Sequence, residues 1–115
     1  MSIISYDDVG EDLRRITISG RLDTPGTNSI AAQLVELVGG PKRAVVVDLS
    51  SVQYLASIGI GALITSAKAV KRRGAKLALV VNKGSDVMMS LQATGIDQLI
   101  PIFRKLSDAE SAALA

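Results

Sequence analysis

One hydroxyl group that could do chemistry belongs to Ser57, which lies where a strand pattern gives way to a helix pattern. The β-branched run Val45–Val47 predicts a buried strand upstream, and apolar residues at helical spacing follow downstream: Ile60, Leu63, Ile64, Ala67 and Val70. A serine at such a junction can cap the helix by accepting a bond from a backbone N–H, which stabilises by about 1 kcal/mol. The same place suits a phosphoryl group, because helix-start N–H groups favour negative charge. The local pattern alone favours capping over phosphorylation.

Acid–base, thiol and metal chemistry find little support, because the 115 residues include no histidine and no cysteine. The commonest general base, the commonest metal ligand and every thiolate are therefore missing. Asp23 and Asp48 fall at the ends of expected strands without a catalytic partner beside them, so we interpret both as turn-capping carboxylates. We expect no enzyme activity, no catalytic residue, no metal site and no cofactor.

Two other patterns bear on phosphate binding. The Gly59–Ile60–Gly61 step resembles the beginning of a dinucleotide fingerprint, but Ile64 holds the place of the third glycine. We interpret a nearby basic cluster as a solvated helix end: Lys68, Lys71, Arg72, Arg73 and Lys76. With a net charge of +2 and 3% aromatic residues, the chain lacks the basic field and stacking platforms of nucleic-acid binders. We expect no nucleic-acid partner, and nucleotide binding at the glycine turn stays a minor alternative.

Length and composition indicate one domain over residues 1–115. Hydrophobic residues make up 48% and charged residues 21%, enough for an aliphatic core with a charged surface. No apolar run approaches the roughly 20 residues that cross a bilayer, and the N-terminus lacks the basic-then-apolar order of a signal peptide. We expect a soluble cytoplasmic protein that makes no membrane contact.

Periodicity and chain breakers predict the elements that position Ser57. Strands are expected over 3–6 and 13–19 as a hairpin, and over 44–49 and 77–81 as buried strands. A helix begins at Thr24–Pro25, as N-cap and N1, and ends at Gly39–Gly40–Pro41 with a left-handed glycine cap. A short polar turn should follow the strand over 44–49. The next helix is expected over 57–73, with Gly74 after it.

The last third of the chain continues the alternation. Ser85 is expected to cap a short helix that ends at Gly95. A weak strand over 99–103 contains Pro101, which cannot donate to a ladder and therefore belongs at a sheet edge. Ser107 and Glu110 have capping-box spacing for a terminal helix. The order β-β-α-β-α-β-α-β-α predicts a mixed α/β fold with about five strands and four helices, and parallel later units.

The assembled pattern resembles the STAS domain, specifically the bacterial anti-sigma factor antagonists. Three stretches carry the resemblance, which covers nearly the whole chain: Gly20–Arg21–Leu22–Asp23, Val45–Val46–Val47–Asp48–Leu49–Ser50, and Tyr54–Leu55–Ala56–Ser57–Ile58–Gly59–Ile60–Gly61. The resemblance implies a mixed sheet whose helices pack largely on one face.

The resemblance also implies partner switching as the function. In this family the unphosphorylated antagonist binds an anti-sigma factor that has serine kinase activity, and the sigma factor is released. Phosphorylation of a serine at the start of the second helix ends the binding, and a PP2C-type phosphatase restores it. Ser57 matches that serine. The implied partner-binding residues are Asp23, Thr24, Pro25, Ala56, Ser57, Ile58, Gly59 and Ile60, in a monomer or weak dimer.

The chain departs from the family pattern beside this serine. Many members have Asp-Ser-Ser-Gly or Asp-Ser-Thr-Gly, where this chain has Ala56–Ser57–Ile58–Gly59. The acceptor serine is kept, the preceding carboxylate and the second hydroxyl are lost, and Ile58 adds apolar surface that favours binding. The alternative is a STAS scaffold, never phosphorylated, or an accessory subunit of a signalling or transport complex.

Overall fold

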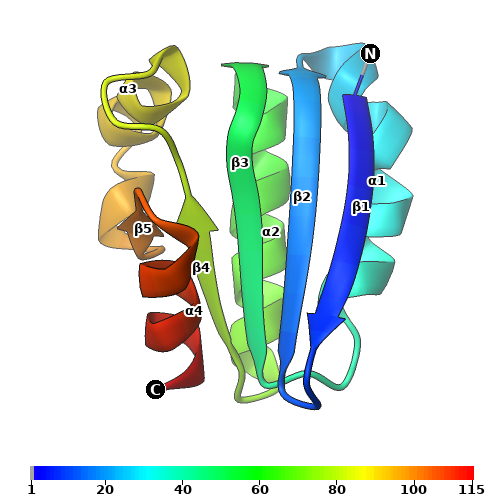
Figure 1. Ribbon diagram of the computed structural model, residues 1–115. Coiled ribbons are helices and arrows are strands. Elements are labelled where there is room, and N and C mark those ends of the chain that lie inside the picture. Colours follow the sequence, from blue (N-terminus) through cyan, green and yellow to red (C-terminus); the bar gives the residue numbers. More distant parts are fainter. Residues whose placement is uncertain (1) are drawn as a thin grey trace.

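A computed structural model describes residues 2–115 as a five-stranded sheet in the order β1-β2-β3-β4-β5 (Figure 1). The strands are β1 (Ser2–Val9), β2 (Leu13–Leu22), β3 (Ala44–Leu55), β4 (Lys76–Val80) and β5 (Ile102–Phe103). The helices are α1 (Thr24–Val38), α2 (Ser57–Arg72), α3 (Asp86–Ala93), the 3-10 helix η1 (Ile96–Gln98) and α4 (Leu106–Leu114). β1 pairs antiparallel with β2, and all later pairs are parallel. The mixed α/β fold is confirmed.

Helices cover both faces of the sheet, but unequally. The main core lies under α1, α2 and α3, where their apolar side chains meet strand residues such as Ile16, Val45 and Val47. A smaller core lies on the opposite face, where Ala109 and Ala113 of α4 pack near β3 and β4 (Figure 1). Successive strand residues point to opposite faces, so the fully apolar start of β3 serves both cores.

β3 is longer than its local pattern predicts. The expected strand over 44–49, followed by a polar turn, is in fact one strand of 12 residues that ends at Leu55. Its second half pairs with β2, from Ser51 opposite Ser19 to Leu55 opposite Leu22, with one register shift just before Ser19 and a second between Gly20 and Arg21. Such bulges keep a polar stretch in the ladder while changing which side chains point outward. Long-range pairing with β2 therefore overrides the turn signal.

Some predicted helix and strand ends are confirmed. Gly74 follows α2 in the left-handed region at φ 76°, and the Ser85 hydroxyl accepts the N–H of Met88 at the start of α3. The strand expected over 99–103 lies at the sheet edge beside β4 as predicted, but it covers only Ile102–Phe103. Pro101 precedes it, and the Pro101 carbonyl accepts the N–H of Leu79 at 2.9 Å.

The caps predicted for the end of α1 and the start of α4 are wrong. Gly39 has φ −80°, so it ends α1 without a left-handed cap, and its N–H bonds to the carbonyl of Val35. α4 begins at Leu106 with Lys105 as its N-cap and no side-chain cap bond, so the capping box of Ser107 and Glu110 does not form. Glu110 instead lies 3.1 Å from the Arg15 guanidinium on β2, and this ion pair links α4 to the sheet.

The parallel strands give the molecule two different ends. At the end where β2 and β3 finish, α1 and α2 begin, and we call this the serine end. We call the opposite end the arginine end; there β2, β3 and β4 begin and α1 and α2 finish (Figure 1). Within residues 2–115 no helix is both long and apolar enough for a membrane span.

Arginines close the arginine end. Arg14 holds Asp8 through two bonds of 2.8 and 3.0 Å and donates to the Leu37 carbonyl at 3.1 Å. Arg73 donates to the carbonyls of Val38 and Lys42. Burial lowers the pKa of Arg73, with a smaller contribution from the charge of Arg14. The bonds to Leu37 and Val38 satisfy carbonyls in the last turn of α1 that have no helical partner.

Candidate functional site

Ser57 is the first residue of α2 and is exposed. The N-cap is Ala56, which has extended backbone (φ −88°, ψ 171°) and makes no side-chain cap bond. The capping role predicted for Ser57 is therefore wrong, because the hydroxyl lies one residue too far along the chain. The first turn of α2 also carries no acidic residue. The result is a free hydroxyl at a helix start that lacks any negative group from its own first turn.

The neighbouring loop is built around Asp23, which caps α1 in place of the expected Thr24. Its carboxylate accepts the N–H of Gly26 at 2.9 Å, and Arg21 lies 3.6 Å from its other oxygen. The bond from Gly26, and secondarily the charge of Arg21, lowers the pKa of Asp23. Thr24 and Pro25 then occupy the first two helical positions and are exposed. This loop presents two of the predicted partner contacts to solvent.

A backbone bond joins the two loops. The N–H of Ala56 donates to the carbonyl of Leu22 at 3.0 Å, so the start of α2 is fixed against the end of β2. Gly59 makes that closeness possible, since an added Cβ would lie 2.8 Å from a methyl of Leu55 and 3.0 Å from both the Cβ and the carbonyl of Leu22. The absence of a side chain at Gly59 therefore lets α2 approach Leu22 and Leu55 closely.

Gly59 and Ile60 do not belong to an open surface. Ile60 is 7% exposed and packs in the main core, and Gly59 is buried. Both were predicted to contact a partner, and we withdraw them because helical periodicity turns them inward. The space that a nucleotide phosphate would need at this turn is filled by Leu22 and Leu55, which removes the basis of the nucleotide-binding alternative. Gly61, by contrast, is exposed, with nothing within 4 Å of an added Cβ.

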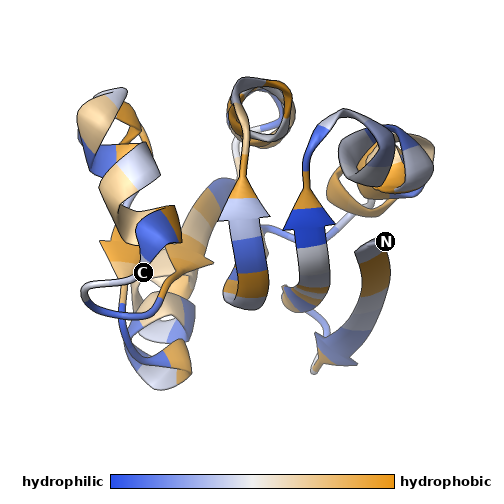
Figure 2. Cartoon of the chain, turned by 90° about the horizontal axis from the view of Figure 1, so that it is seen from above, coloured by the Kyte–Doolittle hydropathy of each residue, from blue (hydrophilic) through white to orange (hydrophobic). Residues whose placement is uncertain are grey.

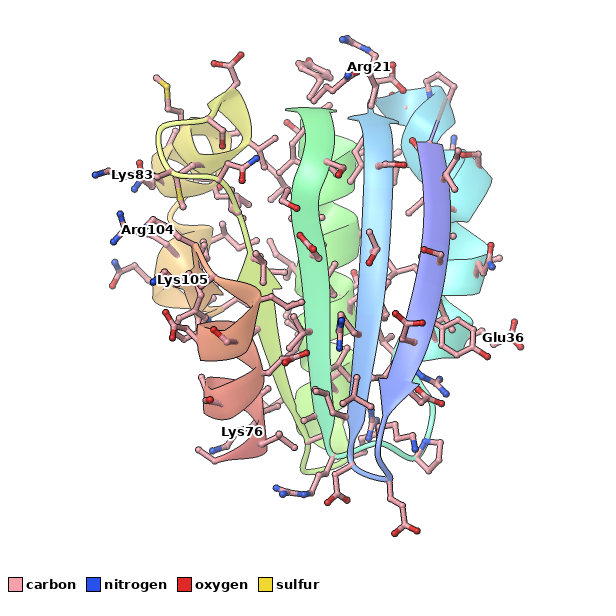
Figure 3. The ribbon with its side chains drawn as sticks, in the orientation of Figure 1. Arg21, Glu36, Lys76, Lys83, Arg104 and Lys105 are labelled. Atoms are coloured by element: carbon pink, nitrogen blue, oxygen red, sulfur yellow. The ribbon has the colours of Figure 1, made fainter. Side chains whose placement is uncertain are left out.

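Sequence reasoning missed one pair at this end. The Arg21 guanidinium lies 4.6 Å from the centre of the Tyr54 ring, a cation–π distance. Tyr54 is 42% exposed, and Figure 3 shows Arg21 projecting beyond the sheet at the serine end. Both residues stand in the stretches that carry the family resemblance. The sequence feature that could have indicated this pair is Tyr54, an aromatic residue three positions before Ser57.

The exposed side chains of these loops form what we call the serine surface: Arg21, Thr24, Pro25, Tyr54, Ser57 and Ile58. Figure 2 looks down onto this end of the molecule, where α1 and α2 begin beside the strand ends. Ile58 is 38% exposed, so the surface combines hydroxyl, aromatic and apolar groups. The Asp48 carboxylate bonds within its own strand, where it accepts the N–H of Ser50 at 2.9 Å. Over residues 2–115 no cluster of potential metal ligands occurs. The arrangement suits protein binding better than acid–base catalysis.

Comparison with known proteins places this chain in a family. The sequence profile of the STAS domain matches residues 7–109. The chain belongs to the STAS domain family. Among the relatives of this STAS domain is the anti-sigma-F factor antagonist RsfB of Mycobacterium tuberculosis (strain ATCC 25618 / H37Rv), 28% identical over 94 residues that cover 82% of this chain and 75% of RsfB.

Solved structures share the fold of this STAS domain. An anti-sigma factor antagonist from Mycobacterium paratuberculosis superposes with a TM-score of 0.89 at 21% identity, over 100% of this chain and 96% of the other. The phosphorylated form of the Bacillus cell fate determinant SpoIIAA gives a TM-score of 0.67 at 16% identity, over 93% and 96% of the two chains. At these identities the likeness concerns the fold.

Proposed function

We propose that this STAS domain is an anti-sigma factor antagonist that binds its partner through the serine surface and is switched off by phosphorylation of Ser57. The observation that carries the proposal is the exposed hydroxyl of Ser57 in the first turn of α2, which the helix does not use as its cap. The name of the relative RsfB supports the class of partner.

The switch follows from electrostatics at the start of α2. A phosphoryl group would add about −1.5 to −2 charges, and the first-turn N–H groups of α2 would stabilise that charge within the domain. A partner docked over Ile58 and Tyr54 would instead have to desolvate the phosphate. Repulsion and desolvation together would then end the binding without unfolding the domain.

The proposal also includes the enzymes that phosphorylate and dephosphorylate Ser57. The anti-sigma factor partner would carry the serine kinase activity that modifies Ser57, and a PP2C-type phosphatase would restore the free hydroxyl. Ala56 leaves the kinase without a neighbouring carboxylate to recognise, so recognition would rest on the apolar side chain of Ile58 and on the loop of Thr24 and Pro25.

The binding test uses the purified anti-sigma factor with wild type, Ser57→Ala and Ser57→Asp. Ser57→Ala should bind like wild type, because the hydroxyl makes no cap bond. Ser57→Asp should lose affinity roughly 100-fold, the effect of an unpaired charge desolvated in an interface. Ser107→Asp is the matched control, because Ser107 is an exposed serine in the first turn of α4. Wild-type affinity in Ser57→Asp would refute the switch.

A second candidate is a scaffold or accessory subunit that is never phosphorylated. The absence of any acidic residue at Ala56 and in the first turn of α2 favours it. Intact mass spectrometry after incubation with the partner and ATP separates the two candidates. One phosphate adduct, absent from Ser57→Ala, supports the switch, whereas an unmodified chain that still binds supports the scaffold.

A further inference from the structure

A second candidate binding site lies on the flank formed by α3, β5 and the start of α4. An open groove of about 780 Å³ runs between these elements. Met88, Met89 and Phe103 supply its apolar lining, and Lys83, Arg104 and Lys105 supply cations. Figure 3 shows these three basic side chains on one flank of the molecule. We call this feature the flank groove, and it shares no residue with the serine surface.

The cations of the flank groove have no structural partner. Each ion pair of residues 2–115 uses Arg14, Arg15, Arg21 or Arg43, and never a groove cation. Lys83 follows β4, and Arg104 and Lys105 follow β5. Lys105 is the N-cap of α4, a place where positive charge destabilises a helix. Neither the helix start nor an ion pair accounts for this charge, so the cations of the groove are free to face a ligand outside the chain.

Two carboxylates also line the flank groove, Asp97 and Asp108. Each lies in the first turn of a helix, Asp97 in η1 and Asp108 in α4, where negative charge stabilises the helix start. Local structure therefore accounts for both carboxylates, but not for the three cations. Three cations against two carboxylates leave the groove with an excess positive charge of one.

The apolar lining indicates what kind of ligand accompanies the negative charge. Met89 is 61% exposed, and the neighbouring Met88 and Phe103 are half-buried. Methionine side chains are flexible and polarizable and adapt to varied apolar partners. An open groove of this kind suits a peptide laid along it, whereas small molecules prefer pockets that enclose most of their surface.

We propose that the flank groove binds an acidic segment of a partner protein. An apolar side chain of that segment packs against Met88, Met89 and Phe103, and its carboxylates face Lys83, Arg104 and Lys105. The contact is separate from Ser57, so it adds a second docking site to the protein and does not depend on the phosphorylation state.

The test uses a fluorescein-labelled peptide of about 12 residues, rich in Glu and carrying two Leu anchors, a length that spans a groove of this kind. Binding is followed by fluorescence anisotropy and by the methyl NMR signals of Met88 and Met89. Both methyl signals should shift on binding, and Ser57→Asp should bind the peptide like wild type. The double variant Arg104→Glu/Lys105→Glu should lose at least about tenfold in affinity, as expected for reversed charges at an interface.

The matched control is Lys68→Glu/Lys71→Glu, which makes the same charge change at exposed positions of α2. It should retain affinity within about twofold, since neither lysine lines the flank groove and exposed charges outside an interface are screened by salt. Equal loss in both double variants would overturn the proposal, because binding would then follow net charge alone. Urea unfolding of each variant verifies that it is folded.

Two further results would overturn the proposal. A peptide whose Leu anchors are replaced by Ser should bind more weakly, and equal binding would mean that the apolar lining is not used. ATP or inorganic pyrophosphate that displaces the peptide and shifts both methyl signals alike would show that the groove takes a small anion. Absence of any methyl shift with the Leu peptide would also refute the site.

Discussion

The two ends of the sheet differ in how the unpaired backbone groups of the helix termini are satisfied. At the arginine end, Arg73 and Arg14 donate to the carbonyls left unpaired where α1 finishes. At the serine end, Asp23 caps α1, but α2 has Ala56 as its N-cap and no side-chain cap bond. One end is closed by charged hydrogen bonds, and the other leaves the start of α2 open to solvent.

This difference suggests that the arginine end mainly stabilises the fold, whereas the serine end is available for binding. Hydrogen bonds to charged groups each contribute about 1.5–3 kcal/mol net, so the arginine end should dominate the response to mutation in unfolding experiments. The serine end carries exposed Tyr54 and Ile58, whose loss should matter mainly for binding. The comparison therefore predicts that stability and affinity respond to different residues.

Arg73→Met should give the largest loss of stability, about 2–3 kcal/mol, because it leaves the carbonyls of Val38 and Lys42 without their donor. The urea midpoint measures the change, with the slope checked for constancy. Arg72→Met is the control, since Arg72 is exposed in the last turn of α2, and should change stability by less than about 0.5 kcal/mol. Equal losses would mean that Arg73 acts through helix charge rather than through its bonds.

The two glycines of α2 should respond with opposite signs. Gly59→Ala should destabilise by about 1–3 kcal/mol through overpacking against Leu22 and Leu55. Gly61→Ala should stabilise by up to about 1 kcal/mol, because alanine is the better helix former and the space beside it is free. Thermal melting distinguishes the two. A stabilising Gly59→Ala would show that β2 and α2 are less tightly joined than the backbone bond implies.

Ile58→Ser should separate affinity from stability at the serine end. We expect roughly a tenfold loss of affinity for the anti-sigma factor, as for an apolar contact of about 1.4 kcal/mol. The melting temperature should change little, because Ile58 is already 38% exposed. Leu99→Ser removes a more exposed apolar side chain, 72% exposed and outside the serine surface, and should keep full affinity. If both variants bind alike, the docking surface lies elsewhere.

Low pH should lower the stability of the fold slightly, through one carboxylate at each end of the sheet. This is the smallest of the expected effects. Bonds from Arg14 lower the pKa of Asp8, and the bond from Gly26 lowers that of Asp23. A depressed pKa means that each carboxylate stabilises the fold fully above its ordinary value of 3.8. That contribution is lost as the pH falls through the lower folded value.

Melting curves between about pH 6 and pH 2.5 test this linkage. Asp8→Asn should flatten the acid decline more than Asp23→Asn, because Asp8 accepts two bonds from Arg14 whereas Arg21 lies 3.6 Å from Asp23. Asp23→Asn should also keep the start of α1, since asparagine caps as well as aspartate. A steeper decline in either variant would contradict the assigned direction.

The order of elements and most of the architecture could be predicted from local patterns, because strand alternation, helical spacing and breakers agree along the chain. Pro101 at the sheet edge and the Ser85 cap are examples in which one residue decides the outcome. The length of β3 could not be predicted in this way, because its second half is held by pairing with β2. No local pattern contains that partner.

At the candidate site, the caps of α1 and α2 were each predicted one residue too far along the chain. Asp23 rather than Thr24 caps α1, and Ala56 rather than Ser57 stands at the cap of α2. Cap assignment depends on where the backbone leaves extended geometry, which composition does not reveal. Ile60 was included among the partner-binding residues on the family resemblance, although it also begins the apolar stripe of α2, and the structure packs it in the core.

Ala56 carries a consequence for anyone who wishes to engineer a thermostable variant. Replacing it with serine or aspartate would supply the missing cap and raise stability by about 1 kcal/mol. The new acceptor would then occupy the amides that a phosphate on Ser57 would otherwise engage. If Ser57 is the switch proposed above, heat resistance gained at this position would reduce the stabilisation that α2 offers to the phosphate, whereas the methyl group of Ala56 leaves those amides free.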